Sequence, residues 1–135
     1  MAHFAELDND NRVVRINYGP DHITEEEIRA RGLNVRKCSY NTRGGVHYDP
    51  VTGEPSEDQS KAYRLNFPGT GWVYDETING FRPDGPLYPS WTLDVSKGLY
   101  VAPIPQPDDP LKIWDEELYQ SDNTQGWVDK DYNQL

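Results

Sequence analysis

The sequence is poor in aliphatic residues, in basic residues and in cysteine. Hydrophobic residues make up 35% of its 135 positions, against about 45–50% apolar residues in ordinary globular domains. Lysine and arginine total 13 and aspartate and glutamate total 23, which gives a formal net charge of −10. This balance argues against a protein that binds nucleic-acid phosphates or an anionic membrane surface. It favours docking onto a basic or polar protein surface.

Three further absences narrow the class of protein. The single cysteine, Cys38, has no partner in the chain, which excludes a disulfide-stapled scaffold. No apolar run approaches the ~20 residues that a membrane-spanning helix needs. Residues 1–8 contain neither the basic nor the apolar segment of a signal peptide, so we expect synthesis in the cytoplasm.

The N-terminal part of the chain, residues 1–70, is expected to form a β-rich body. Residues 4–17 alternate apolar and polar side chains around the turn-forming segment 8–11, which predicts a hairpin. Thr24 begins a capping box, acidic residues follow it, and glycine comes after the last basic residue. This pattern predicts one short helix over about 24–31.

Two more strands and a loop complete this body. Residues 33–40 and 46–48 carry strand-forming side chains between turn signals. Residues 49–61 are polar, acidic and rich in helix and strand breakers, so we expect a long solvated surface loop there.

Residues 71–107 repeat one pattern, in which an aromatic strand, an aspartate turn, a glycine and a second apolar strand follow one another. Trp72 and Trp91 occupy equivalent places in the two matching copies. A third copy with a longer loop begins near Trp114, within a predicted C-terminal arm at residues 108–135. Each copy has the character of a short β-hairpin.

Proline-rich segments separate these hairpins. Residues 82–89 and 103–110 should be extended and stiff, because proline fixes φ and removes a hydrogen-bond donor. The sequence therefore predicts a mainly β protein of short antiparallel hairpins with one short helix, proline-rich extended linkers and a C-terminal arm.

No set of residues indicates catalysis, a cofactor or a metal site. His3, His22 and His47 lie far apart and lack zinc-site spacing. The segment 8–11 resembles the start of a calcium loop but lacks its central glycine and terminal glutamate, which favours a hairpin turn. Cys38 is expected to be a half-buried, inert thiol rather than a nucleophile paired with His47.

The aromatic residues are the most informative feature. They could form small internal cores, anchor a protein interface, or stack on sugars. The scarcity of aliphatic side chains adds support to the interface interpretation. The predicted interface residues are Trp72, Tyr74, Phe81, Tyr88, Trp91, Tyr100, Trp114 and Trp127.

Four segments carry a family resemblance: residues 1–8, 39–48, 53–61 and 88–94. Together they resemble a family of small virion-associated structural proteins of tailed phages of marine bacteria, cyanophages in particular. The resemblance covers roughly residues 1–105. Members are usually longer between the first hairpin and the second of these segments.

The resemblance implies a virion component rather than a mechanism. We expect a phage structural protein that decorates or cements the capsid, or serves the tail or neck, through protein–protein contacts. Its partners would be major capsid or tail and neck subunits, in multiple copies set by virion symmetry, without nucleic acid, membrane or cofactor. The alternative is a glycan-binding module on a capsid or tail fibre, and an enzyme is the interpretation with least support.

Overall fold

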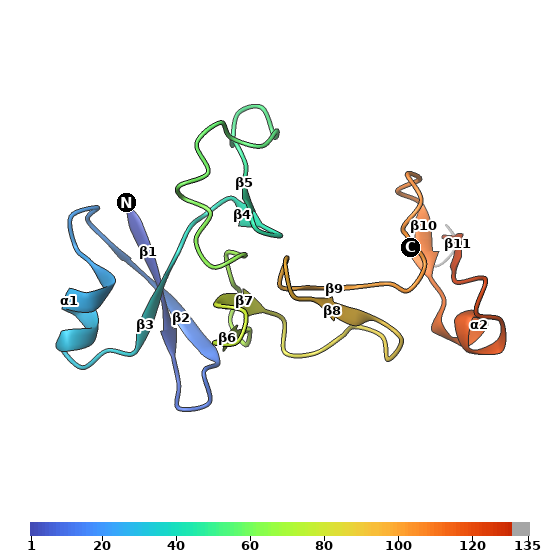
Figure 1. Cartoon of the computed structure of the whole chain (residues 1–135), viewed down its shortest axis with the longest axis horizontal. Helices are drawn as coiled ribbons and strands as arrows, with labels where there is room; N and C mark the ends of the chain where they lie inside the picture. The colour runs from blue at the N-terminus through green and yellow to red at the C-terminus, as the bar shows by residue number, and fades with distance from the viewer. Residues whose placement is uncertain (131–135) are drawn as a thin grey trace. The chain divides into compact units, whose positions relative to one another are not determined.

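A computed structural model describes residues 1–130 of the chain. It is mainly β, with short antiparallel hairpins, which confirms the predicted fold class (Figure 1). The chain divides into two compact units. The first unit is residues 1–85 with 93–99, and the second is residues 86–92 with the chain from Tyr100 onward. The predicted boundaries after residues 70 and 107 differ from this division.

The elements follow one another as short strands with two helices. They are β1 (Ala2–Leu7), β2 (Val13–Gly19), α1 (Glu25–Ala30), β3 (Val35–Cys38), β4 (Thr42–Arg43), β5 (Val46–His47), β6 (Val73–Asp75), β7 (Gly80–Arg82), β8 (Thr92–Asp94), β9 (Leu99–Val101), β10 (Lys112–Trp114), α2 (Glu116–Ser121) and β11 (Trp127–Asp129). Residues 49–61, predicted as a loop, contain no helix or strand.

A three-stranded antiparallel sheet in the order β2-β1-β3 organises the first unit. The predicted hairpin forms its first two strands. In the turn, the Asp8 Oδ1 atom accepts hydrogen bonds from the backbone N–H groups of Asp10 and Arg12. These bonds close the turn, as the turn interpretation of residues 8–11 predicted. Val14 is an extra residue in β2, because Glu6 pairs with Arg15 and Leu7 pairs with Val13.

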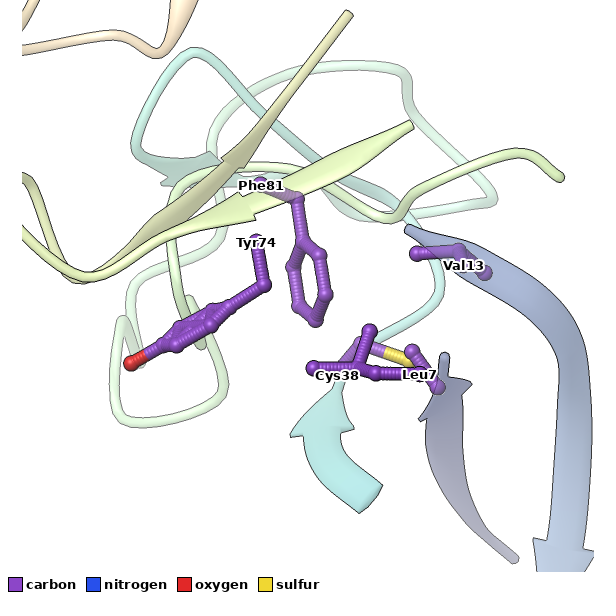
Figure 2. Close-up of a cluster of buried hydrophobic side chains, with 6 residues drawn as sticks. Leu7, Val13, Cys38, Tyr74 and Phe81 are labelled. Carbon is purple, nitrogen blue, oxygen red and sulfur yellow. The ribbon is translucent and has the colours of Figure 1, made fainter. Parts of the chain in front are cut away.

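Side chains alternate along each strand, so apolar residues lie on both faces of this sheet. Both faces are covered by other parts of the first unit. Ala2 and Phe4 point to one face, where Ile28 of α1 packs on them together with Val35. Ala5, Leu7, Val13 and Cys38 point to the other face, where they meet Tyr74 and Phe81 of the β6–β7 hairpin. Figure 2 shows the Phe81 ring directed from the hairpin toward Cys38 and Leu7. The first aromatic repeat is therefore part of the body of the first unit.

The buried side chain of Asn66 ties three hairpin segments of the first unit together. It accepts a hydrogen bond from the Gly44 N–H at 2.8 Å. It donates to the backbone oxygens of Phe81, Lys97 and Gly98 at 2.9, 2.8 and 3.2 Å. Only 1% of Asn66 is exposed. This amide therefore links the turns of the β4–β5 and β8–β9 hairpins to β7.

Both helices are six residues long. α1 confirms the predicted short helix, with the Thr24 hydroxyl accepting from the Glu27 N–H. α2 was not predicted, because its residues were assigned to a loop; the Asp115 side chain caps it by accepting from the Leu118 N–H. The third copy of the repeat is a β10–β11 hairpin, as predicted, and its long loop contains α2. Apart from Arg82, which ends β7, the proline-rich segments 82–89 and 103–110 contain no helix or strand.

Candidate docking surfaces

Three of the eight predicted interface residues lie inside the chain. Tyr74 and Phe81 are buried in the core of the first unit, and Trp114 is buried in the second. Trp72 is partly buried against the same core as Phe81. The three buried side chains pack inside the chain and leave little of their surface for a partner, whereas Trp72 keeps part of its surface exposed.

The second unit is built around an aromatic cluster, which we define as Tyr88, Trp91, Trp114, Tyr119 and Trp127. The ring centroids of Trp114 and Trp127 are 5.3 Å apart, and Trp91 lies 6.1 Å from Trp114 and 6.2 Å from Trp127. Tyr88 and Tyr119 contact this group at 5.4 and 5.3 Å. Such tilted and edge-to-face pairs are the arrangements that aromatic quadrupoles favour.

Hydrogen bonds fix two of the three indoles. The Trp114 indole N–H donates to the Glu116 carboxylate at 3.0 Å, and Ser90 donates to the same oxygen at 2.6 Å. The hydrogen bonds from Ser90, from Gln120 and then from Trp114 lower the pKa of Glu116. The Trp127 indole donates to the Ile104 carbonyl oxygen at 2.9 Å. Among the described residues, the buried Trp91 N–H has no hydrogen-bond partner.

The remaining predicted residue, Tyr100, is half-buried on β9. The eight residues therefore fall into two separate groups, one in each unit. The structure favours internal aromatic cores for most of them, which was one of the three interpretations that the sequence left open.

Sequence reasoning missed a surface in the first unit that we call the tyrosine patch: His3, Tyr18, Tyr40 and Phe67. Tyr18 is 65% exposed and Tyr40 is 60% exposed. The His3 ring contacts all three partners, at centroid distances of 5.0, 6.1 and 5.5 Å, and Tyr40 also contacts Phe67 at 5.2 Å. Burial and then the nearby N-terminal ammonium group lower the pKa of His3, which keeps its ring uncharged at neutral pH.

The hairpin pattern alone would not have found this patch. A turn at residues 8–11 would place Leu7 opposite Arg12 and His3 opposite Ile16. In the structure the turn closes at Asp8 and Arg12, and Val14 is an extra residue, so two shifts in register bring Tyr18 opposite His3. Two rings facing each other across an exposed edge of a hairpin form a cross-strand aromatic pair. Tyr40 and Phe67 come from segments whose position no local pattern gives.

A polar cavity of about 480 Å³ lies beside α1 in the first unit. Its wall includes the ion pair between Glu25 and Arg64, whose side chains are only 11% and 20% exposed. Burial opposes ionisation of Glu25, but hydrogen bonds from Arg64 and the Lys37 N–H outweigh it and lower the pKa of Glu25. Arg64 also stacks on the Tyr74 ring, 5.5 Å from its centroid. Through Lys37 and Tyr74, this ion pair therefore ties α1 to β3 and to the β6–β7 hairpin.

The residues considered for chemistry are separate from one another. Burial raises the pKa of the Cys38 thiol to about 12, so the thiol is protonated and inert at neutral pH. His47 instead shares a hydrogen bond with Ser56 at 2.9 Å. Within residues 1–130, no three histidine, cysteine or acidic side chains are grouped as metal ligands. No helix in that range is long and apolar enough to cross a membrane.

Comparison with protein-family models, with curated proteins and with solved structures finds no match.

Proposed function

We propose that this chain is a structural protein of a phage particle, a capsid decoration or cement protein or a tail or neck accessory, that acts through protein–protein contacts. The observation that carries the proposal is the tyrosine patch. Tyr18 lies on β2 and Tyr40 in the turn after β3. Exposed tyrosines supply large contact area at low cost in conformational entropy, and they are enriched at binding hot spots. The resemblance over residues 1–105 supports the virion as the place of action.

The construction of the two units supports the same conclusion. Each unit has a small core that depends on aromatic rings. Aromatic side chains bury more area per residue than aliphatic ones, which lets a short chain fold with few aliphatic residues. The surface keeps its acidic charge, which favours basic neighbours.

Mass spectrometry of gradient-purified phage particles tests this function. We expect the chain to be present in stoichiometric amounts after washes that remove loosely bound protein. A chain present in infected cells but missing from washed, mature particles would refute the proposal.

One observation favours the alternative, a glycan-binding module. A groove of about 300 Å³ in the second unit is lined by Trp127, Thr124, Gln125 and prolines 105 and 107. An aromatic ring beside hydroxyl and amide groups suits a neutral sugar. A glycan array with the unmodified chain and Gln125→Ala separates the functions, since sugar binding that the substitution removes would favour the module.

A further inference from the structure

We propose that the outer edge of β2, at Ile16 and Tyr18, pairs with an extended strand of a partner protein that carries lysine or arginine side chains. The inference rests on the proposed function and deepens it, because it names the surface and the kind of segment that would meet there. The outer edges of the sheet are β2 and β3. Their outward backbone groups differ, because those of β3 are mostly hydrogen-bonded and those of Ile16 and Tyr18 on β2 are not.

The direction of the backbone groups in the sheet follows from one hydrogen bond and the strand register. The Leu7 N–H donates to the Asn34 carbonyl oxygen at 2.8 Å, so Leu7 points toward the β3 side of β1. Backbone groups of successive residues point to opposite sides of a strand. Phe4 and Glu6 therefore point toward β2 and bond to their partners Asn17 and Arg15.

This alternation fixes the outer edge of β2. Because Asn17 and Arg15 point toward β1, the N–H and C=O groups of Ile16 and Tyr18 point away from the sheet. The backbone groups of Val13, on the other side of the extra residue Val14, also point away from β1. The Val13 N–H donates to the Trp72 carbonyl and its own carbonyl accepts from Gly71, both at 2.8 Å.

The opposite edge of the sheet, on β3, is closed by side chains. The Lys37 N–H donates to the Glu25 carboxylate, and the Lys37 carbonyl accepts from Arg64 at 3.1 Å. The Val35 carbonyl accepts from the Arg36 guanidinium at 2.9 Å. These bonds occupy three of the four outward backbone groups of Val35 and Lys37, so another strand cannot pair there without breaking a buried ion pair.

The β2 edge is covered only where it begins. Gly71 and Trp72 occupy the outward groups of Val13, and no described residue bonds to those of Ile16 or Tyr18. The exposed fraction is 40% for Val14 and 65% for Tyr18. An open edge with exposed apolar side chains is a template for another strand.

The side chains around this edge indicate the chemistry of the partner. Tyr18 belongs to the tyrosine patch, so a cation on a paired strand can lie over its ring. Carboxylates stand near both ends of the strand, at Asp8 and Asp10 in the turn and at Asp21, which also pairs with the N-terminal ammonium group. The charge of Arg15, on the strand itself, is balanced by its ion pair with Glu6. A second copy of this chain would bring another net charge of −10 to the same place, which opposes pairing between two β2 edges.

A synthetic peptide tests the edge in the isolated chain. The probe is a capped hexapeptide of alternating valine and lysine, added to the full chain at low ionic strength. We expect slower hydrogen exchange at the Ile16 and Tyr18 amides, measured by NMR. Tyr18→Pro removes the outward N–H and should abolish binding without breaking a bond to β1, because edge proline is tolerated. The matched control Tyr18→Thr keeps that N–H and should retain protection of the Ile16 amide.

Peptide binding that leaves both amides unprotected, or that is equal in Tyr18→Pro and Tyr18→Thr, would overturn the inference. Sedimentation of the chain alone tests whether a second copy of the chain occupies the edge instead. A dimer that Tyr18→Pro dissociates and Tyr18→Thr does not would show that the edge pairs with a second copy, and would also overturn it.

Phage particles separate failure of the inference from failure of the proposed function. We expect less Tyr18→Pro chain than Tyr18→Thr chain in purified particles. Equal amounts of the two variants in particles would refute the β2 edge and leave the virion function standing. Absence of the unmodified chain from particles would refute the virion function, while the peptide experiment would still decide whether the edge binds a strand.

Discussion

Asn66 illustrates how one polar side chain can organise a unit with few aliphatic residues. Its amide makes four hydrogen bonds to backbone groups of other segments, and it is almost fully buried. A buried network of this kind is specific because every donor and acceptor must find its partner. Asn66 thus replaces part of the apolar packing that the sequence lacks.

Replacing Asn66 with alanine should destabilise the first unit strongly. The substitution leaves the Gly44 N–H and three carbonyl groups without their partner, and each unsatisfied buried group costs about 1–3 kcal/mol. We expect the free energy of unfolding to fall by at least about 2 kcal/mol in urea titrations. Asn9→Ala, in the exposed turn of the first hairpin, is the control and should change it by under about 0.5 kcal/mol. Equal effects of the two substitutions would contradict the role of Asn66.

Cys38 should behave as a structural side chain. Its pKa is raised to about 12 by burial, so almost no thiolate forms at pH 8. We expect the native chain to react with an aromatic disulfide reagent only at the rate at which it unfolds. Full and rapid reaction should appear in denaturant. Rapid labelling of the folded chain would show that the thiol is accessible and would contradict its place in the core.

At the scale of elements, the ion pair between Glu25 and Arg64 joins α1 to β3 and makes stability depend on pH. Hydrogen bonds to its carboxylate lower the pKa of Glu25 in the folded chain. A carboxyl whose pKa is lowered by folding contributes stability above its unfolded pKa and loses that contribution as the pH falls through the folded value. Since an unfolded glutamate titrates near pH 4.3, at about its model-peptide pKa, the loss should begin below about that pH.

Glu25→Gln isolates this contribution from the other acids. The unmodified chain should be more stable than the variant at pH 7, and the difference in free energy of unfolding should stay constant down to about pH 4.3 and then narrow. Urea titrations across that range measure it. A difference that grows as the pH falls would contradict the sign of the pKa shift.

The aromatic cluster decides whether the second unit folds. Trp114 is 6% exposed and contacts three other rings. Replacing it with alanine should cost about 3–5 kcal/mol, which is more than a unit this small can lose. We expect the β10–β11 amides to lose hydrogen-exchange protection.

Two internal comparisons control this experiment. Ile113→Ala alters the exposed neighbour on the same strand and should leave the protection nearly unchanged. The β1 amides should stay protected in both variants, because the cores of the first unit contain none of these rings. Protection of β10–β11 that survives Trp114→Ala would contradict the cluster's role.

Local signals predicted the elements that are stabilised locally. The turn at residues 8–11 and the capping box at Thr24 each depend on hydrogen bonds between residues a few positions apart, and both are confirmed. The same cap logic applies to Asp115 and α2, but the lack of basic residues in the last turn hid that helix. The two residues of β4 pair only with β5, which is too short a pattern to predict alone.

At the scale of the whole molecule, the sequence predicted that aromatic side chains supply most of the contact surface. It did not predict which parts of the chain pack against them. Alternation along a strand assigns Phe81 to a face, yet it does not say that β1 and β3 supply the other side of that contact. Trp114 was predicted to face a partner, whereas Trp91 and Trp127, from segments far apart in the chain, cover it. The tyrosine patch was missed for the same reason, since Phe67 reaches it from a segment without regular structure.

The central claim is that the first unit meets another virion protein through the tyrosine patch. Hydroxyl-radical footprinting of Tyr18 and Tyr40, in the free chain and in purified particles, tests it most directly. Val51, which is 90% exposed in the acidic loop, serves as the internal reference. We predict that oxidation of both tyrosines is several-fold lower in particles relative to Val51. Equal oxidation of the tyrosines in the free and particle-bound chain would contradict the account.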